Sequence, residues 1–481
     1  MSFINREGYL TFIASFTKKD ARFEFEAARA DGLASHGGLI AIDALAREFG
    51  LWERLEGSTL LDPRRDKKRG HSVGLVCSQI ILSLCSGGAG LADAERLGLY
   101  PALLQLLGMD KCADASTLGQ WLRGQSQQSL HELQAINRDL VAWALKKADP
   151  KRVRRDECLE CFFDDTQIEL SGRYFEGSEI NYNGDRAYSW QTFWVGPFLA
   201  DQILDAGNTD VSAHLPVLLA DTERLWGDDA LMGTAHFYAD SGSSAGKFLN
   251  VVTAHRWSWS ISYNKWTEIP GRLAAGLPEE EWSEAREAIG RKGQAIIEQH
   301  GWLRHLPGEE CREAQDFAVV RYRDKDGLLI WNYAFVVCGG PHHQQATHRP
   351  ETAAPVFARH KLKGACELGF SELLSDLDLH HPPCQSLIAN QVFYALATLA
   401  FNLMQAFRVL HLSDAEQGMR VRSLIRHIIS VPVKLVRHAN RLKARLMPPP
   451  AWLRWWELFL KKVLPKRPPG RPKATAPPPS D

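Results

Sequence analysis

Three acidic residues, Asp164, Asp240 and Glu367, stand where a carboxylate could do chemistry. Asp164 lies in FFDDTQIELSG, an apolar strand pattern that runs into acids and then a turn. Asp240 lies in HFYADSG, a second such pattern, which ends in a Ser-Gly turn. Glu367 lies in FARHKLKGACELGFSELL, which has the pattern of a helix. Two strand ends and one helix could bring the three carboxylates to one point.

Such a point suits a divalent metal ion. Negatively charged oxygen ligands are the ones that hard cations such as Mg²⁺ or Mn²⁺ prefer. Without a cation, crowded carboxylates raise one another's pKa, so the cluster makes most sense with metal bound. The three residues therefore predict a metal site.

The segments around these acids indicate an α/β core. From about residue 156 the pattern has period two, in ECLECFFDDTQIEL and then AYSWQTFWVGPFLADQILDA. A helix, a strand, a second helix and the strand WSWSISY follow. This order predicts a mixed sheet with helices on its faces. Further along, LIANQVFYALATLAFNLMQAFRVL is a long apolar helix that we expect to pack across the sheet.

The flanking segments differ from this core. Residues 1–150 have helical spacing of apolar residues and predict a helical N-terminal domain. Between the core strands and Glu367 we expect an acidic helix around residues 278–299 and a hairpin turning at Lys325-Asp326-Gly327. The predicted division is a core at 151–263 and 349–415, a β-rich insertion at 264–348, a basic helical region at 416–464 and a disordered Pro-rich tail at 465–481.

The composition of the chain limits which classes of protein it can belong to. The chain has 481 residues without an apolar run of about 18 or more, so we expect no membrane span. Its first segment is broken by Glu7 and does not have the pattern of a signal peptide, which favours a cytoplasmic protein. Nine cysteines without regular spacing argue against a disulfide framework. The lone pair Cys158-x-x-Cys161 is more typical of core residues than of a zinc or redox site.

Charge is unevenly spread over a chain whose formal net charge is zero. No Asp or Glu occurs from Gln417 to Trp456, although arginine and lysine are frequent there. A second basic run extends from Lys146 to Arg155. Patches of one sign on a neutral protein favour a polyanionic partner, and a run of this length favours nucleic acid over a merely solvated helix face.

Four stretches match a known family in order and spacing. They are DDTQIELSGRYFEGSEINYNGDRAYSW, YADSG, the helix with Glu367, and LIANQVFYALATLAFNL with its Ala-Asn-Gln and Asn-Leu. Through them the chain resembles bacterial insertion-sequence transposases of the DDE type, from about Gly37 to about Arg445. The resemblance implies an α/β fold with an RNase H-like mixed sheet and flanking helices, interrupted by a β-rich insertion. It also implies that the N-terminal domain could bind DNA ends.

The resemblance assigns the catalytic and metal-binding carboxylates to Asp164, Asp240 and Glu367. Asp165 is the alternative to Asp164, but the spacing to Thr166 favours Asp164. Glu372 is a rival for Glu367, but it lacks the basic residue four positions before it. The chain departs from the family's third motif, where Tyr, Arg and Lys are expected. Those positions hold His360, Lys363 and Leu374.

The resemblance and the charge pattern together predict DNA contacts. The candidates near the metals are Arg359, His360 and Lys363, and those in the C-terminal region are Arg420, Arg422, Arg426, Lys434, Arg437 and Arg441. At the mouth of the insertion, Trp257, Trp259, Tyr263 and Trp266 could stack a flipped base, although Trp257 and Trp259 share a strand face that favours the core. The tail PPGRPK is similar to a minor-groove hook without the Arg before Gly.

The activity implied is cut-and-paste transposition by a metal-dependent endonuclease. Two Mg²⁺ or Mn²⁺ ions would support hydrolysis at terminal inverted repeats and strand transfer to target DNA. The expected partners are double-stranded DNA and a second copy of the chain on paired ends, with no membrane, in the bacterial cytoplasm at the nucleoid. Two alternatives stay open: an inactive or domesticated relative that only binds DNA, as Leu374 suggests, and a nuclease of this fold without strand transfer.

Overall fold

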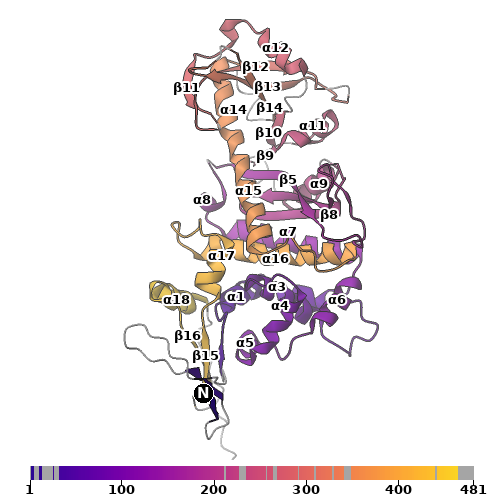
Figure 1. Cartoon of the computed structure of the whole chain (residues 1–481), viewed down its shortest axis with the longest axis vertical. Coiled ribbons are helices and arrows are strands. Elements are labelled where there is room, and N and C mark those ends of the chain that lie inside the picture. The colour runs from indigo at the N-terminus through magenta and orange to yellow at the C-terminus, as the bar shows by residue number, and fades with distance from the viewer. Residues whose placement is uncertain are drawn as a thin grey trace, which may run out of the picture.

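The structure is a computed structural model. It describes residues 2–4, 10–12, 25–26, 32–155, 157–210, 213–226, 235–255, 257–263, 268–290, 292–307, 310–327, 330–340, 348–438 and 441–463. Within these ranges a large mixed sheet and many helices form an α/β protein, consistent with the predicted class (Figure 1). The segments expected for the flipped-base Trp266 and for the tail hook lie outside the described residues.

Five strands form the part of the sheet that holds the predicted acids. They are β5 (Leu159–Glu169), β7 (Arg186–Val195), β8 (Phe198–Ala206), β9 (Ala235–Ala239) and β10 (Ser258–Tyr263). β5 lies between antiparallel β7 and parallel β9, β8 pairs with β7, and β10 runs parallel to β9. A two-residue strand, β6 (Glu179–Ile180), pairs with the start of β7 on the edge opposite β5, the edge that β8 also pairs with. Nearly all residues of β7 and β9 are buried, since helices cover both faces of the sheet.

The insertion extends this sheet. Its strands are β11 (Arg286–Ile289), β12 (Ala295–His305), β13 (Gln315–Asp324) and β14 (Asn332–Gly339). They are antiparallel neighbours in that order, and β14 pairs with β10. The predicted hairpin around Lys325 joins β13 and β14. The predicted acidic helix over 278–299 is wrong: a short 3-10 turn, η3 (Glu279–Glu281), leads into β11 and β12, because ten residue pairs between β12 and β13 outweigh local helix propensity.

The helices that follow the core strands were also predicted. α9 (Leu215–Trp226) and α11 (Gly246–Thr253) come after β8 and β9. The insertion begins with α12 (Glu268–Ala275), which was not predicted. The nine cysteines are free thiols, and Cys158 and Cys161 are buried in the core as expected.

The N-terminal half is helical from Leu39 onward, as predicted. Its helices are α1 (Leu39–Phe49), α2 (Leu51–Gly57), α3 (Val73–Cys85), α4 (Leu91–Arg96), α5 (Pro101–Leu107), α6 (Ala115–Arg123), α7 (Gln127–Lys147) and α8 (Pro150–Val153), with the 3-10 turn η1 (Leu97–Leu99) after α4. Before them, β1 (Ser2–Ile4), β2 (Leu10–Phe12) and β3 (Phe25–Glu26) form a small sheet of their own, and β4 (Leu33–Ala34) follows. The expectation of helix throughout is therefore wrong for the first residues.

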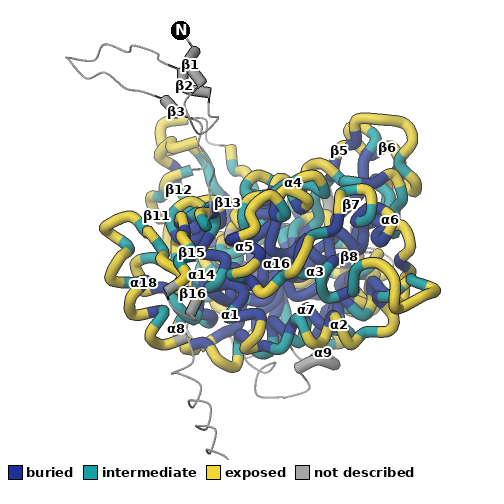
Figure 2. The backbone as a smooth tube through the Cα atoms, turned by 90° about the horizontal axis from the view of Figure 1, so that it is seen from below, coloured by how far each residue is buried: buried dark blue, intermediate teal, exposed yellow. Residues whose placement is uncertain are grey.

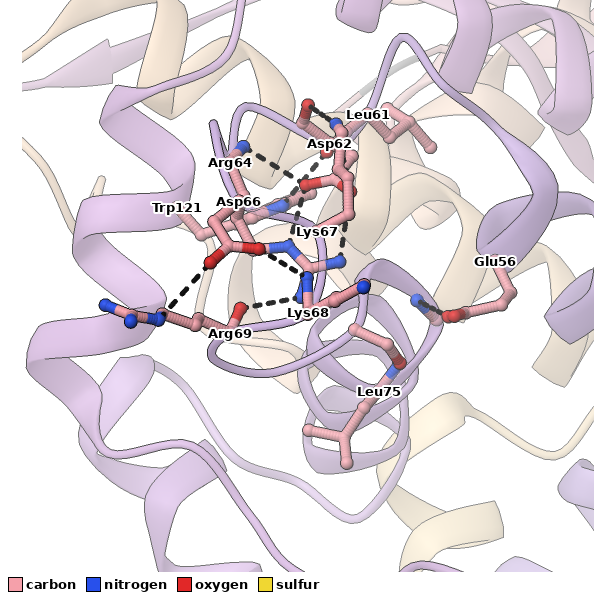
Figure 3. A network of polar contacts seen from close by, with 12 residues as sticks. Glu56, Leu61, Asp62, Arg64, Asp66, Lys67, Lys68, Arg69, Leu75 and Trp121 are labelled. Carbon is pink, nitrogen blue, oxygen red and sulfur yellow. Dashed lines mark hydrogen bonds and ion pairs between the residues drawn. The ribbon is translucent and has the colours of Figure 1, made fainter.

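The loop between α2 and α3 is held by charge. Asp62 accepts hydrogen bonds from Arg64 Nε at 2.8 Å and is also paired with Lys67 (Figure 3). These donors hold the pKa of Asp62 well below its usual value, the Arg64 hydrogen bond being the largest cause. Trp121 of α6 donates to the Leu61 carbonyl at 3.1 Å, so the loop is fixed against the helical half.

α16 (Leu387–His411) is the central helix of the molecule. It is long and apolar enough to cross a membrane by length and composition, yet 89% of its most apolar window is buried inside the protein. It lies between the sheet on one side and the N-terminal helices on the other (Figure 1), and it is buried along most of its length (Figure 2). The prediction that this helix packs across the sheet is confirmed, since it contacts β8 as well as α3 and α7.

Polar residues fix α16 in place. Asn402 is fully buried; its Oδ1 accepts from the Leu199 backbone N–H at 3.0 Å, and its Nδ2 donates to the Leu199 carbonyl at 2.7 Å. The same Nδ2 lies 2.7 Å from Oδ1 of Asn137, which itself donates to Leu199 and Ala200. One amide thus joins α16, α7 and β8.

A helical column connects the insertion to α16. After the 3-10 turn η4 (Pro350–Thr352) it comprises α14 (Ala353–His360), η5 (Lys361–Lys363), α15 (Gly364–Ser371) and the π-helical turn η6 (Glu372–Asp376). Figure 1 shows it running along the sheet from β12 down to α16. Gly369 permits the close approach, because a Cβ at this position would lie 2.6 Å from the Trp194 ring of β7.

The C-terminal region is not the predicted basic helix. Only α17 (Val421–Leu424) and the π-helical turn η7 (Ile425–Ile429) are helical before Pro432. The chain then forms a hairpin of β15 (Val433–His438) and β16 (Arg441–Leu446), with β15 also paired to β4, and ends its described part in α18 (Pro450–Val463). Apolar residues alternate with basic ones along β16 and over the first three residues of β15, which is a strand period and not a helical one.

Candidate functional site

Asp164 lies in the middle of β5 and is buried. Its Oδ2 accepts a hydrogen bond from Lys363 Nζ at 2.8 Å, and its Oδ1 accepts from the Asp165 backbone N–H at 3.1 Å. Thr192 of β7 donates to its backbone carbonyl at 3.0 Å. Burial raises the pKa of Asp164, and Lys363 acts in the opposite direction.

Asp240 lies next to Asp164 because of the strand register. Phe162 pairs with Tyr238 in the parallel β5–β9 ladder; two residues later the first segment has Asp164, still on β5, and the second has Asp240, directly after β9. Asp240 Oδ1 accepts from the Gly242 backbone N–H at 3.0 Å, which fixes the turn after β9. Its charge is close enough to raise the pKa of Asp164. Two of the three predicted carboxylates are therefore brought together.

Asp165 is the neighbour that the sequence left as an alternative. Burial, then Asp164 and Asp240, raise its pKa to about 6. Successive strand residues face opposite sides of a sheet, and Lys363 of the helical column contacts Asp164, not Asp165. Asp164 therefore lies on the face that the column covers, the face on which Glu367 would also be expected.

Glu367 is an exposed residue of α15, one turn after Lys363. Burial raises the pKa of the adjacent Cys366 thiol well above its usual value, with contributions from Asp164, Glu367 and Asp240. All three carboxylates therefore lie within electrostatic reach of one side chain. No group of three or more His, Cys, Asp or Glu in the described residues is close enough to hold a metal ion. Glu367 therefore lies near Asp164 and Asp240 but does not form a three-residue metal-binding cluster with them.

The predicted rival Glu372 has another role. Its carboxylate is buried and accepts from Arg408 Nη1 at 2.9 Å and from Gln405 Nε2 at 3.1 Å, both on α16. The Val421 backbone N–H also donates to it, at 3.2 Å. Glu372 joins the column to α16 and α17.

Arg359 is held against the sheet. It donates to Glu160 Oε1 and to the Tyr238 hydroxyl, each at 3.1 Å, while Tyr238 donates to the other oxygen of Glu160. Glu160 lies on the same face of β5 as Asp164, and Tyr238 on the same face of β9 as Asp240. Glu160 and Tyr238 were not predicted, because Arg359, which they contact, lies 199 and 121 positions away from them in the chain.

His360 also faces the sheet. Its two ring nitrogens lie 3.1 Å from Ser260 Oγ and 2.7 Å from Ser262 Oγ, both on β10. Burial lowers its pKa to about 4, so the ring is neutral near pH 7. Of the three basic residues predicted near the metals, Lys363 alone contacts a predicted metal-binding acid.

Three of the four aromatic residues predicted at the mouth of the insertion lie within the described residues, and these three pack in or against the core. Trp257 and Trp259 are almost fully buried, and Tyr263 packs edge-on against Phe317 at 4.9 Å.

Beside the site, a cavity of about 480 Å³ lies between the start of β5 and α15. The residues that line this cavity include the basic residues Lys151 and Arg155 and the aromatic residue Trp194.

The basic residues of the C-terminal region separate into two groups. Arg420 is bound to Asp376 at 3.0 Å and to Ser371 at 2.9 Å, and Arg422 lies 3.8 Å from Asp376. Exposed residues form the second group, and these are Arg426, Lys434 and Arg437. Arg441 is the first residue of β16.

Comparison with known families agrees with this arrangement. Residues 26–454 match the model of the family described as transposase DDE domain group 1, so the chain belongs to this family of DDE transposases. Family members carry out DNA transposition and act on DNA, generally with divalent metal ions. No curated protein matches the chain.

Proposed function

We propose that this protein is a cut-and-paste transposase that cleaves DNA at the terminal inverted repeats of an insertion sequence and joins the ends to target DNA. The five strands and their helices would be an RNase H-like core. The observation that carries the proposal is the position of Asp164 on β5 and of Asp240 just after β9, each two residues beyond the Phe162–Tyr238 pair of these parallel strands, with Lys363 of the column that bears Glu367 in contact with Asp164. The family supports DNA transposition in general, and the site supports this mechanism in particular.

The donor set fits a divalent cation. It consists of carboxylate oxygens, and the pKa values of Asp164 and Asp165 are raised in part by the neighbouring charges, a repulsion that a cation would relieve. Asp164 and Asp240 would hold two Mg²⁺ or Mn²⁺ ions together with Glu367. When bound, such ions lower the pKa of water and neutralise charge at phosphorus.

The reaction has two displacements at phosphorus. In the first, a water oxygen bonds to the scissile phosphorus and the bond to the 3′ oxygen breaks, which leaves a 3′-hydroxyl and a 5′-phosphate. In the second, that hydroxyl attacks a phosphodiester of the target, or of the opposite strand to give a hairpin, and the 3′ oxygen of the attacked strand leaves. The protein's part is to hold both DNA segments in line.

The charged side chains divide this work. We assign Lys363 to a DNA phosphate. In this role its ammonium group would leave Asp164 and bind a phosphate oxygen. Arg359 and His360 are occupied by Glu160, Ser260 and Ser262, so we assign them to holding the column on the sheet. The protein would act in the bacterial cytoplasm at the nucleoid, as a dimer on paired ends.

One experiment tests the proposal. A labelled duplex that carries the repeat flanking the gene is incubated with Mg²⁺ or Mn²⁺ and the native protein, or with Asp164→Asn, Asp240→Asn or Glu367→Gln. We expect a cut at the repeat edge, lost more than about 100-fold in each variant, because even groups that only orient metal ligands contribute about 10–100-fold. Glu169→Gln, an exposed acid at the end of the same strand, is the matched control.

Other outcomes point elsewhere. Binding without cleavage by the native protein would favour the inactive relative, the reading that Leu374 motivates. Cleavage that survives Asp164→Asn but not Asp165→Asn would move the ligand by one position. Cleavage without joining to target DNA would favour a nuclease.

A further inference from the structure

The hairpin of β15 and β16 has two unlike faces. In the antiparallel register, Val433 pairs with Leu446, Leu435 with Ala444 and Arg437 with Leu442. The alternate pairs are Lys434 with Arg445 and Val436 with Lys443. Because successive residues alternate sides, one face is largely apolar and the other carries Lys434, Lys443 and Arg445. We call this second side the basic face.

The apolar face anchors the hairpin to the body of the protein. Val433 is fully buried, and Leu435 and Leu446 pack against the main core. The Leu435 backbone N–H donates to the Gly32 carbonyl at 2.6 Å. Gly32 has φ +71°, and a Cβ there would lie 2.6 Å from the Leu435 carbonyl oxygen, so the segment before β4 is fitted closely to β15. The base of the hairpin is therefore fixed.

The basic face carries charge without internal compensation. Lys434, Lys443 and Arg445 are exposed, and their side chains make no hydrogen bond or ion pair within the described residues. Lys434 and Arg445 are directly opposite each other, at a separation where like charges destabilise a strand pair. A protein surface selected for stability alone would place an acid at one of these positions.

We propose that β15 and β16 form a β-ribbon that binds double-stranded DNA in the major groove through the basic face. The proposal rests on the proposed function for the nature of the polyanion. β4 pairs with β15 only at Val433 and Lys434, so the four residue pairs beyond them are two-stranded and extend about 13 Å. The major groove, about 12 Å wide, admits a two-stranded ribbon. Phosphates on either side of the groove would neutralise the opposed cations. Figure 1 shows the ribbon on the far side of α16 from β5, so it would contact DNA away from the cut.

The test measures binding of the full chain to the labelled duplex in EDTA, where no cleavage occurs, over a series of salt concentrations. The variants are Lys434→Ala, Lys443→Ala and Arg445→Ala. The charge pattern alone predicted Arg437 as a DNA contact, but its register with Leu442 places it on the opposite face, and the ribbon proposal assigns it no contact. Arg437→Ala removes the same charge from the same strand and is therefore the matched control. We expect each basic-face variant to bind more weakly and to lower the slope of log K against log salt by about 0.9, the value for one phosphate contact. Arg437→Ala should keep the native slope.

A charge reversal separates binding from folding. Lys434→Glu would place an acid opposite Arg445, so its thermal midpoint should equal or exceed that of the native protein while its DNA affinity falls. Native affinity and slope in all three alanine variants would overturn the ribbon proposal, and so would an equal loss in Arg437→Ala. If the native protein itself fails to bind any duplex, the proposed function fails and the ribbon proposal with it. If it binds and cuts but the ribbon variants do the same, the ribbon proposal alone fails.

Discussion

At the scale of single residues, the Lys363–Asp164 pair is the main feature of the site. A carboxylate this buried needs a compensating cation, since isolated buried charge is costly. Lys363 supplies it from the column, and the pKa of Lys363 is raised by Asp164 despite its own burial. The metal ions that we propose would compete with this ammonium for the same carboxylate.

The loss of stability caused by replacing Lys363 with Met should therefore depend on whether a metal ion is present. In EDTA we expect Lys363→Met to lower the free energy of unfolding by about 3 kcal/mol, the size of effect seen when one partner of a buried pair is removed. Added Mg²⁺ should restore part of that loss, because the ion neutralises Asp164. Thermal unfolding with and without Mg²⁺ measures this, with the exposed neighbour Lys361→Met as control. Equal losses in both buffers would show that no metal reaches Asp164.

A second residue-scale prediction concerns pH. His411 of α16 packs against Phe407 and Phe459, and burial lowers its pKa to about 4. Its unfolded pKa is about 6.5, so the unfolded chain binds more protons between these values, and stability falls as pH drops below about 6.5. Between pH 7 and pH 5 the free energy of unfolding should fall by about 1–2 kcal/mol less in His411→Phe than in the native protein. Denaturant titrations at the two pH values measure this difference. An identical loss in the two proteins would contradict the assignment.

At the scale of elements, the helical column decides whether the site can be complete. Arg359 fixes one end of it to β5 and β9, and Glu372 fixes the other to α16. Between them, Gly369 lets α15 contact Trp194. Small shifts of this segment would move Glu367 relative to Asp164.

Two glycines of α15 offer a direct comparison. Gly369→Ala should cost about 1–3 kcal/mol through overpacking against Trp194, and should reduce cleavage more than Mg²⁺ affinity of the Asp pair. Gly364→Ala meets nothing within 4 Å and should add about 0.5–1 kcal/mol by helix propensity. Denaturant unfolding and the duplex cleavage assay measure both variants. A stable, fully active Gly369→Ala protein would mean that the column does not set the position of Glu367.

How far the sequence predicts these elements depends on whether the deciding forces are local. β5, β9 and α16 have strong periodic patterns, and the adjacency of Asp164 and Asp240 follows from their positions on two strands. Glu and Ala residues dominate the segment of β11 and β12 and predict a helix there, whereas the pairing of β12 with β13 decides for strands. In the C-terminal hairpin the period-two alternation from Val433 was present, but the density of Arg and Lys concealed it. The Glu160–Tyr238–Arg359 contacts join distant segments and leave no local pattern.

At the scale of the whole molecule, the described residues share one large core. A single cluster of buried apolar residues extends from Ala34 to Phe459 and includes the sheet, α16 and the N-terminal helices. Asn390 and Asn402, which lie in the matching stretch of α16, hold backbone groups on either side of it. The predicted domain boundaries remain predictions, but the helical half and the sheet are not separated by solvent.

Unfolding should reflect this shared core. Asn402→Leu removes the hydrogen-bond partner of the buried Leu199 backbone N–H and of Oδ1 of Asn137, so we expect a loss of about 3 kcal/mol in the free energy of unfolding. Because α16 belongs to both halves, the far-ultraviolet and tryptophan fluorescence transitions should shift together. A first transition confined to the N-terminal helices would show that they fold independently.

The continuous core around α16 also has a consequence for where DNA is cut. The ribbon and Asp164 lie on opposite sides of one packed body, so their separation is set by protein and not by DNA. The molecule would then work as a ruler, measuring the cut from the place where the ribbon binds. Substrates with base pairs inserted between the ribbon's footprint and the repeat edge should be cut at an unchanged distance from the footprint. The inserted bases would stay attached to the flanking DNA.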